Sequence, residues 1–337
     1  MPGNTLNIPA HMQAVRIETP GKETGRLITA TVPTPAPAPH EVLIKIAAAG
    51  VNRADIFQKQ GSYPPPEGAS ELPGLEVAGT IAAIGNAVDG WCVGDAVCAL
   101  LPGGGYAEFA VAHGEHLLPL PQGWSMEEGA GLPEALFTVW MALREEARLK
   151  AGESVLIHGG ASGIGMMAIA YAAQLGAKVY TTASTREKCR ACEKAGANTA
   201  ISYRDHDFVA VMQDILPEGV DVVLDMVGGD YIARNFNVLK TDGRMISIAF
   251  LRGAKPEGLS LAPLLLKRLS WKGATLRSRS DHIKAAYAQH IQAQLGTALD
   301  KGRLKPTIDS TFSLEDAEKA HLRMEQNLNI GKIVLQL

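Results

Sequence analysis

The chain has 337 residues, of which 46% are apolar and 20% are charged, and its net charge is −3. This length exceeds what one hydrophobic core usually serves, so we expect two domains. The near balance of charges argues against nucleic acid or an anionic membrane surface as the main partner. No signal-peptide pattern opens the chain and no membrane span is expected, so we predict a cytoplasmic protein.

The first part of the chain predicts a β-rich domain. Residues 1–11 indicate a short disordered extension, and residues 31–39, rich in Pro and Ala, indicate a linker or an edge segment. Stretches rich in β-forming residues and punctuated by glycines then follow, at residues 42–49, 77–85, 95–100 and 106–112. This pattern is typical of an irregular, partly closed β domain.

The stretch at residues 155–165, VLIHGGASGIG, resembles a dinucleotide-binding turn. An apolar run ends in small residues, and a run compatible with a helix follows at residues 166–175. Small residues let backbone N–H groups approach a pyrophosphate closely, and the start of the helix supplies unpaired donors. The glycine spacing is close to G-x-G-x-x-G without matching it, so a tight strand-to-helix connection that binds no ligand is the alternative.

Strand and helix patterns alternate for more than a hundred residues around this turn. Strands are predicted at residues 154–158, 178–182, 199–202, 220–225, 244–250 and 270–276. Helices are predicted between them, at residues 185–195, 205–215, 230–239 and 261–268. Such alternation predicts an α/β fold, with a doubly wound, six-stranded parallel sheet of the Rossmann type.

The tail of the chain predicts a return to the first domain. A helix at 282–301, a strand at 307–312, a helix at 314–325 and a strand at 332–337 are expected to fold back onto the N-terminal part. The nucleotide-binding domain is then inserted, at residues 139–277, between the two parts of a catalytic domain, residues 12–138 and 278–337.

The end of the second sheet strand favours NADPH over NADH. NAD-binding folds commonly place an acid there to bind the ribose 2′-hydroxyl, whereas this chain has Ser184, with Arg186 and Lys188 just beyond. A hydroxyl flanked by cations suits a 2′-phosphate, although the two cations could also form a solvated helix face. The nearby acid, Glu187, is three residues after Ser184, a capping-box spacing.

Several motifs resemble a known family: GVNRAD (50–55), PGLEVAG (73–79), GGYAEF (104–109), LPEALFTVW (132–140), HGGASGIG (158–165), LRSRS (276–280) and NIGKIV (329–334). Together they are similar to the medium-chain dehydrogenase/reductases, specifically the zinc-free NADPH:quinone oxidoreductase branch that includes zeta-crystallin. Within that branch the chain looks nearest to the tumour-suppressor-inducible quinone reductases. The resemblance covers residues 12–337 and implies a GroES-like catalytic domain beside the Rossmann domain.

Departures from the zinc alcohol dehydrogenases of the same superfamily favour a metal-free site. The resemblance aligns the two cysteine ligands of those enzymes with Asn52 and Glu134 of this chain, and their histidine ligand with Leu75. These side chains do not make a stable tetrahedral zinc site. Without a Lewis acid, reduction of a conjugated acceptor is favoured over oxidation of an alcohol.

The resemblance implies two catalytic residues, Tyr63 and Asn52. Tyr63 matches the tyrosine that reaches toward the nicotinamide and substrate, and it could donate a hydrogen bond to a developing oxyanion; packing at a turn is its alternative role. Asn52 is expected to orient the substrate or the ribose, or else to make a backbone bond of the Asx type. Asp55 is expected to fix the local loop or to pair with Arg53.

The cofactor-binding residues are assigned in three groups. Ser162, Gly163, Ile164 and Gly165 are expected to cradle the pyrophosphate, and Ser184, Arg186, Lys188 and Tyr203 to surround the 2′-phosphate and adenine. Asp225 ends a strand where ligands bind in open sheets, with capping of the next helix as its alternative role. By resemblance, Phe250 and Leu251 contact the nicotinamide side, Ser278 and Arg279 follow the last sheet strand, and Asn329 and Lys332 line the cleft between the domains.

These patterns predict an NADPH-dependent, metal-free oxidoreductase that reduces a quinone or a related electrophile. The alternatives are an enoyl reductase of the same superfamily, acting on activated C=C bonds, and a non-catalytic NADPH- or RNA-binding protein of the crystallin kind. A small-molecule substrate is the expected partner. A homodimer is also expected, because relatives pair the edge strand that this chain is predicted to form at residues 272–277.

Overall fold

The structure is a computed structural model that describes residues 8–19, 25–256 and 258–337. The chain divides into two compact units. One is formed by Met1–Phe137 together with Arg277–Leu337, and the other by Thr138–Leu276.

The second unit contains a parallel sheet of six strands, in the order β10-β9-β8-β11-β12-β13. The strands are β8 (Ser154–Ile157), β9 (Lys178–Ala183), β10 (Thr199–Ser202), β11 (Val220–Asp225), β12 (Leu239–Ser247) and β13 (Ser270–Gly273). This order is that of a complete dinucleotide-binding sheet. The predicted doubly wound fold is therefore confirmed.

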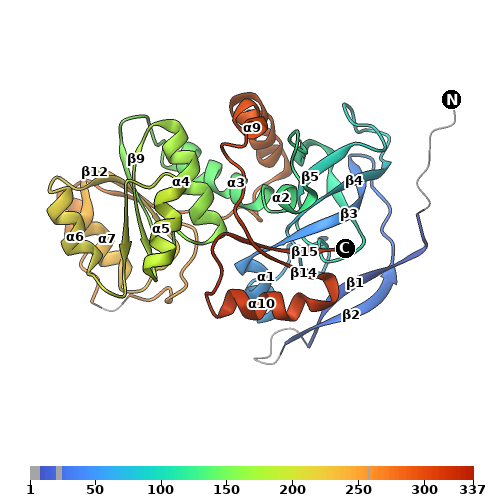
Figure 1. Ribbon diagram of the computed structural model, residues 1–337, viewed down its shortest axis with the longest axis horizontal. Helices are drawn as coiled ribbons and strands as arrows, with labels where there is room; N and C mark the ends of the chain where they lie inside the picture. The colour runs from blue at the N-terminus through green and yellow to red at the C-terminus, as the bar shows by residue number, and fades with distance from the viewer. Residues whose placement is uncertain (1–7, 20–24, 257) are drawn as a thin grey trace. The chain divides into compact units, whose positions relative to one another are not determined.

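Helices cover both faces of this sheet, with α4 and α5 on one side and α6 and α7 on the other (Figure 1). Their bounds are α4 (Gly163–Leu175), α5 (Arg186–Lys194), α6 (Phe208–Ile215) and α7 (Tyr231–Val238), and the unit also contains α8 (Ala262–Leu266) and the π-helical segment η2 (Trp140–Glu146). The buried side chains of Phe208, Phe236 and Val223 form part of the core between helices and sheet. Apolar residues on both faces of the strands explain the near-continuous apolar runs in the sequence.

Two strands in this sheet, β12 and β13, differ from the prediction by more than one residue at an end. Strand β12 begins at Leu239 and ends at Ser247, whereas residues 244–250 were expected. Strand β13 ends at Gly273, because its neighbour β12 stops at Ser247, the residue paired with Gly273. β13 lies at the edge of the sheet, as predicted, but residues 274–277 are not part of it.

The first unit is built on a seven-stranded, mostly antiparallel sheet, in the order β14-β15-β3-β4-β5-β7, with β6 also paired to β3. Its strands are β3 (Glu41–Val51), β4 (Glu76–Ile84), β5 (Ala96–Leu100), β6 (Phe109–His113), β7 (Leu117–Pro119), β14 (Ile308–Ser313) and β15 (Lys332–Gln336). The C-terminal strand β15 pairs with β3, so the tail folds back onto the N-terminal part of the chain.

Helices and turns join these strands. They are α1 (Arg53–Lys59), η1 (Gly114–His116), α2 (Met126–Ala130), α9 (Asp281–Asp300), η3 (Leu314–Asp316) and α10 (Ala317–Glu325), and α3 (Pro133–Val139) leads into η2. The predicted helix at 314–325 is thus a 3₁₀ turn followed by an α-helix. The buried core of the unit includes Ile44, Val77, Ile81 and Tyr106.

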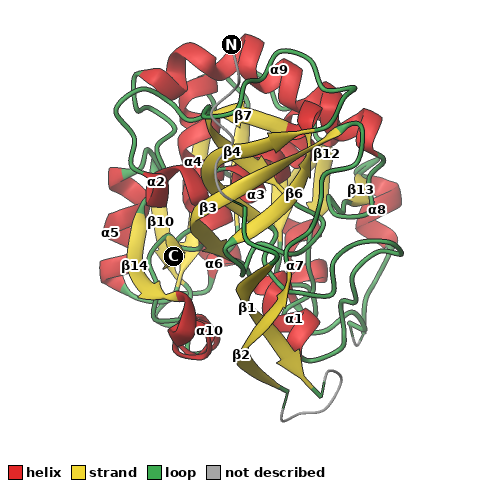
Figure 2. Ribbon diagram, turned by 90° about the vertical axis from the view of Figure 1, so that its right-hand side faces the viewer, coloured by secondary structure: helices red, strands yellow, loops and turns green. Residues whose placement is uncertain are grey.

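A hairpin of β1 (His11–Glu18) and β2 (Arg26–Pro33) precedes this sheet (Figure 2). The sequence prediction missed it. A disordered extension was expected at residues 1–11, of which residues 1–7 lie outside the described residues. The prediction is wrong for His11, because this residue starts β1 and pairs with Pro33. Burial of Met12 and Ala14 against the sheet core explains why this strand forms.

Candidate active site

The glycine turn between β8 and α4 has the geometry that a pyrophosphate needs. Ser162 is the N-cap of α4: its Oγ accepts a hydrogen bond from the Gly165 amide at 3.0 Å and donates one to the Gly159 carbonyl at 2.8 Å. A Cβ atom at Gly165 would lie 2.3 Å from that carbonyl oxygen, so only glycine allows the approach. The amides of Gly163 and Ile164, in the first turn, have no acceptor within the helix. The residues present therefore fit a bound dinucleotide.

Ser184 and Tyr203 lie at the ends of neighbouring parallel strands. Ser184 follows β9 and is buried, and Tyr203 follows β10 with 44% of its surface exposed. The Tyr203 amide donates to the carbonyl of Ala183 at 3.0 Å, so the backbone of Tyr203 lies next to the strand end that carries Ser184. Arg186, in the first turn of α5, is exposed beside them.

The predicted capping box of Ser184 and Glu187 is wrong. The N-cap of α5 is Thr185, whose hydroxyl accepts from the Lys188 amide at 3.2 Å, because the helix begins one residue later than the spacing implied. The hydroxyl of Ser184 is thus not needed for helix capping.

Asp225 is held inside the loop that follows β11. Its Oδ1 accepts from the amides of Val227 at 2.8 Å and Gly228 at 3.2 Å, while burial raises its pKa. The N-cap of α7 is Asp230, so the alternative of helix capping by Asp225 is wrong.

Phe250 and Leu251 are two further cofactor candidates that follow a strand of the parallel sheet. They follow β12, are 42% and 45% exposed, and the Leu251 amide donates to the carbonyl of Met226, just after β11. All the candidate cofactor residues of this unit therefore gather at the carboxyl ends of the sheet strands, the edge where nucleotides bind in such folds. Their contact with a cofactor stays a prediction.

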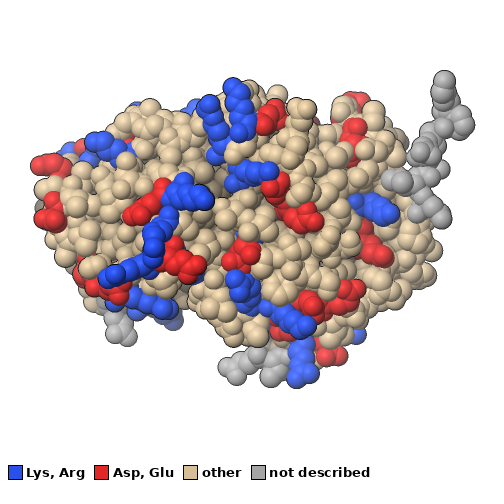
Figure 3. All heavy atoms as spheres, viewed as in Figure 1, with Lys and Arg blue, Asp and Glu red and all other residues tan. Residues whose placement is uncertain are grey.

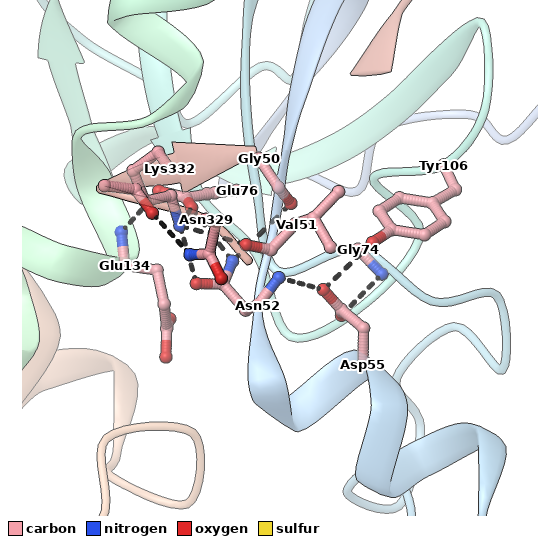
Figure 4. A network of polar contacts seen from close by, with 11 residues as sticks. Gly50, Val51, Asn52, Asp55, Gly74, Glu76, Tyr106, Glu134, Asn329 and Lys332 are labelled. Atoms are coloured by element: carbon pink, nitrogen blue, oxygen red, sulfur yellow. Dashed lines mark hydrogen bonds and ion pairs between the residues drawn. The ribbon is translucent and has the colours of Figure 1, made fainter. Parts of the chain in front are cut away.

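A buried network in the first unit joins Lys332, Glu76 and Asn52 (Figure 4). The ammonium group of Lys332 pairs with Oε1 of Glu76 and donates to Oδ1 of Asn52 at 2.7 Å and to the carbonyl of Val51 at 3.3 Å. Nδ2 of Asn52 donates to Oε1 of Glu76 at 2.9 Å, and it lies 3.5 Å from the Gly50 carbonyl. The hydrogen bonds of Asn52 to the side chains of Glu76 and Lys332 are thus shorter than its contact with the backbone, which was the alternative role for this residue.

Glycine at position 50 makes room for this network. A Cβ atom there would lie 2.2 Å from Oε1 of Glu76 and 2.6 Å from the carbonyl oxygen of Ala130. The motif GVNRAD therefore begins with glycine because the Glu76 carboxylate packs directly against its backbone.

Glu134 is attached to the same network through its backbone. Its amide donates to Oε2 of Glu76 at 2.9 Å, while its carboxyl group extends away from the network (Figure 4). Burial, and next the negative charge of Glu76, raise the pKa of Glu134 to about 8, although Lys332 and Arg277 act in the opposite direction.

Asp55 fixes the loop that carries Asn52. Its Oδ2 accepts from the Asn52 amide at 2.8 Å and the Tyr106 hydroxyl at 3.1 Å, and its Oδ1 accepts from the Gly74 amide at 3.1 Å. Burial raises the pKa of Asp55 to about 6 in spite of these bonds. The alternative pairing with Arg53 is wrong, because that guanidinium bonds to α10 and to the turn after it.

Tyr63 lies beside a buried arginine. The guanidinium carbon of Arg277 is 5.4 Å from the centre of the Tyr63 ring, and its nitrogens donate to the Pro102 carbonyl and to Oε1 of Gln58, each at 2.9 Å. Burial and the charge of Glu134 raise the pKa of Tyr63, whereas Arg277 lowers it. The phenol is thus a hydrogen-bond donor at neutral pH.

The remaining cofactor candidates of the first unit, Ser278, Arg279 and Asn329, lie in turns and loops. Ser278 and Arg279 lie in the turn before α9, and Nδ2 of Asn329 donates to the Gly331 carbonyl at 2.8 Å in the loop before β15. Their cofactor contacts, and that of Lys332, stay predictions. Lys332 nevertheless belongs to the Glu76 network, which the sequence reasoning missed.

The positions that bind zinc in related enzymes hold other chemistry. Leu75 is buried and apolar, and Asn52 and Glu134 make the contacts described above. Among the residues that the structure describes, no group of three His, Cys, Asp or Glu side chains could hold a metal ion. Zinc independence of the activity stays a prediction.

Two family models match the chain: "Alcohol dehydrogenase GroES-like domain" over residues 38–122 and "Zinc-binding dehydrogenase" over residues 163–292. These matches, with the architecture above, define a dehydrogenase/reductase of the medium-chain type. A quinone oxidoreductase of Lama guanicoe is 33% identical over 97% of this chain and 98% of its own length.

Solved structures agree with this relationship. The quinone oxidoreductase of Escherichia coli, complexed with NADPH, has a TM-score of 0.86 at 28% identity, covering 96% of this chain and all of that one (100%). The CurK enoyl reductase has a TM-score of 0.84 at 27% identity, covering 97% and 99%. The chain belongs to the quinone oxidoreductase family of the medium-chain dehydrogenase/reductase superfamily. The resemblance to its tumour-suppressor-inducible branch stays a prediction.

Proposed function

We propose that this chain transfers a hydride from NADPH to a quinone or a related electrophilic acceptor, without a catalytic metal ion. The relatives named quinone oxidoreductases support the acceptor, and the NADPH complex of the E. coli protein supports the cofactor. One observation carries the proposal: the ammonium group of Lys332 is bound to Glu76 and to Asn52. Asn52 stands at a position where zinc enzymes have a metal ligand, so a cation of the protein itself lies beside that position. A metal-free site suits an acceptor whose conjugated system spreads the developing negative charge.

NADPH would supply the hydride, and residues of this chain would hold and orient it. The glycine turn and Ser162 would bind the pyrophosphate through backbone amides. Arg186 and Lys188, next to Ser184, would bind the 2′-phosphate, and Tyr203 would lie along the adenine. A charge-assisted bond contributes about 1.5–3 kcal/mol, enough for a preference of about tenfold or more over NADH.

On the acceptor side, Tyr63 would donate a hydrogen bond to the oxygen that gains negative charge. Asn52, oriented by Lys332 and Glu76, would position the acceptor or the nicotinamide ribose. Because the network binds both the oxygen and the NH₂ group of the Asn52 side-chain amide, the orientation of this amide would not change during the reaction.

A small-molecule partner fits the surface of the molecule. On the face seen in Figure 3, basic and acidic side chains are interspersed. No helix among the described residues combines the length and the apolar character that crossing a membrane requires. A cytoplasmic location and a homodimeric state are also part of the proposal.

Turnover of NADPH and NADH with a panel of quinones, enoyl thioesters and alcohols tests this function. We expect quinone reduction with NADPH, unchanged after prolonged chelation, and no stoichiometric zinc by elemental analysis. Faster reduction of the enoyl thioesters would support the second candidate, an enoyl reductase, which the CurK structure favours. NADPH binding without turnover of any acceptor would point to a non-catalytic binding protein.

A further inference from the structure

Arg277 is a buried cation that forms no ion pair with a carboxylate among the described residues. Only 7% of its surface is exposed, and its guanidinium donates to two neutral oxygens at 2.9 Å, the carbonyl of Pro102 and Oε1 of Gln58. A buried charge is normally paired, because taking it out of water is destabilising. A buried cation that is bound only to neutral groups therefore points to a task for its charge.

The aromatic group beside this cation is the ring of Tyr63. The guanidinium carbon of Arg277 is 5.4 Å from the ring centre, a distance at which a cation and an aromatic ring attract each other. Nη1 of Arg277 also lies 3.4 Å from the carbonyl oxygen of Tyr63. On the other side, the Tyr63 amide donates to the carbonyl of Phe57 at 3.3 Å. The ring and the backbone of Tyr63 are thus held by two different segments of the chain.

Neighbouring helices hold Arg277 itself in position. Nε2 of the buried Gln58, on α1, donates to the Glu71 carbonyl at 2.9 Å, so the amide oxygen of Gln58 is turned toward the guanidinium. The buried ammonium group of Lys284, on α9, donates to the Arg277 carbonyl at 3.1 Å. Because the N–H groups of a planar guanidinium point in fixed directions, these contacts determine how it lies.

The charge of Arg277 also acts on the hydroxyl of Tyr63. Burial, and next the negative charge of Glu134, raise the pKa of this phenol, whereas Arg277 lowers it. The other charges within electrostatic range of Arg277 are those of Asp55 and Lys284. A phenol that loses its proton more readily donates a stronger hydrogen bond to an oxygen that gains negative charge.

We propose that Arg277 is a positioning residue that holds Tyr63 in place and supplies a positive charge over its ring, so that the Tyr63 hydroxyl donates a stronger hydrogen bond as the acceptor oxygen becomes negative. This inference rests on the proposed function. Arg277 acts through Tyr63 and need not contact the acceptor. The device suits acceptors whose oxygen gains negative charge when hydride arrives, as a quinone oxygen does.

A double-mutant cycle tests whether Arg277 acts through Tyr63. Arg277→Gln should lower the rate of hydride transfer to a quinone by about fivefold in stopped-flow measurements, and KM for NADPH should change little. In a protein that already carries Tyr63→Phe, the same substitution should cause no further loss, because the hydroxyl that it serves is gone. Equal losses in both backgrounds would overturn the inference, since they would indicate a general structural defect.

Two further variants separate the charge of Arg277 from its packing. Arg277→Lys keeps a positive charge without the planar donor group, so its rate should lie between those of the unmodified protein and Arg277→Gln. Arg303→Gln, at an exposed arginine in the turn after α9, is the matched control and should keep the original rate. A rate of Arg277→Lys no higher than that of Arg277→Gln would overturn the role of the charge. If Arg277→Gln does not fold by circular dichroism, Arg277→Lys in the two backgrounds provides the same cycle.

The contact can also be measured without cofactor or acceptor. In protein labelled with fluorotyrosine, the fluorine NMR signal of position 63 is identified by its absence in Tyr63→Phe. Ionisation of this phenol should move to a pH that is higher by about 1 in Arg277→Gln, and it should not move in Arg303→Gln. An unchanged titration in Arg277→Gln would overturn the inference.

These measurements separate the inference from the proposed function. If the unmodified protein reduces quinones but the cycle shows no coupling, Arg277 is not a positioning residue for Tyr63 and the proposed function stands. If the unmodified protein reduces no quinone while the fluorine signal titrates as expected, the proposed function is wrong and the positioning role falls with it, although the contact between the two residues is measured.

Discussion

Nζ of Lys332 lies 2.7 Å from Oδ1 of Asn52, and this contact determines how the Asn52 amide is turned. An ammonium group can only donate, so the amide oxygen must face Lys332 and the NH₂ group must face Glu76. The amide orientation, which is often ambiguous, is thereby fixed by chemistry.

Lys332→Met should destabilise the protein by about 3–5 kcal/mol, since it leaves the buried carboxylate of Glu76 without its cation. Urea unfolding monitored by circular dichroism measures this loss. Lys319→Met, at an exposed lysine, is the control and should stay near the original stability. Adding Glu76→Gln to Lys332→Met should recover part of the loss; no recovery would show that packing, and not the charge, explains it.

Tyr63→Phe should lower the rate of hydride transfer by about tenfold. One oxyanion donor typically contributes about 2.7–4 kcal/mol, and a quinone spreads its charge more widely, so a smaller effect is expected. Stopped-flow transfer and an NADPH titration measure both steps. Unchanged transfer with weakened NADPH binding would instead make Tyr63 a cofactor contact.

Arg186→Ala combined with Lys188→Ala should raise KM for NADPH far more than KM for NADH. The physical reason is the loss of charge-assisted bonds to the 2′-phosphate, a group that NADH lacks. Steady-state kinetics with both cofactors provides the measurement. Equal changes would refute the assignment of this phosphate site.

His158 should make the stability of the protein sensitive to acid. Its Nε2 donates to Oδ1 of Asn235 at 2.7 Å, its Nδ1 lies 2.9 Å from the Thr182 hydroxyl, and burial lowers its pKa to about 4. The unfolded chain binds this proton near pH 6.5, so the stabilising contribution is present above that pH and is lost as the pH falls toward 4.

His158→Gln should therefore reduce the slope of unfolding free energy against pH by about 1.4 kcal/mol per pH unit between about pH 5 and 6. Denaturant melts at several pH values measure the slope, and His206→Gln, at an exposed histidine, is the control. An unchanged slope in His158→Gln would show that this histidine is protonated in the folded state.

Light scattering at micromolar concentration should give the mass of a dimer. Among the residues that the structure describes, the edge strand β13 pairs with another strand on one side only, and Leu265 and Leu266 of the preceding helix α8 are 79% and 77% exposed. Leu265→Glu with Leu266→Glu should shift the mass toward a monomer if this edge forms the interface. A monomeric mass for the unmodified chain would contradict the expected assembly.

The sequence allowed the parallel sheet to be predicted nearly strand by strand, because each buried strand is a continuous apolar run that ends in a turn. The buried polar network of the candidate site was harder to predict. Glu76 and Lys332 are 256 residues apart, and nothing local marks them as partners. Arg277 precedes the two residues chosen from LRSRS, and only burial distinguishes it from Arg279. The β1–β2 hairpin was missed because β1 borders a stretch that looked like an extension.

The Lys332–Glu76 pair also limits how this site could be redesigned. Asn52→Cys, Leu75→His and Glu134→Cys would restore the ligand types of a zinc dehydrogenase, yet the metal would meet an ammonium group bound beside Asn52. Two cations in one buried volume repel strongly. Conversion to a metalloenzyme would therefore require a neutral residue at position 332 as well, so four positions that are distant in the sequence would have to change together.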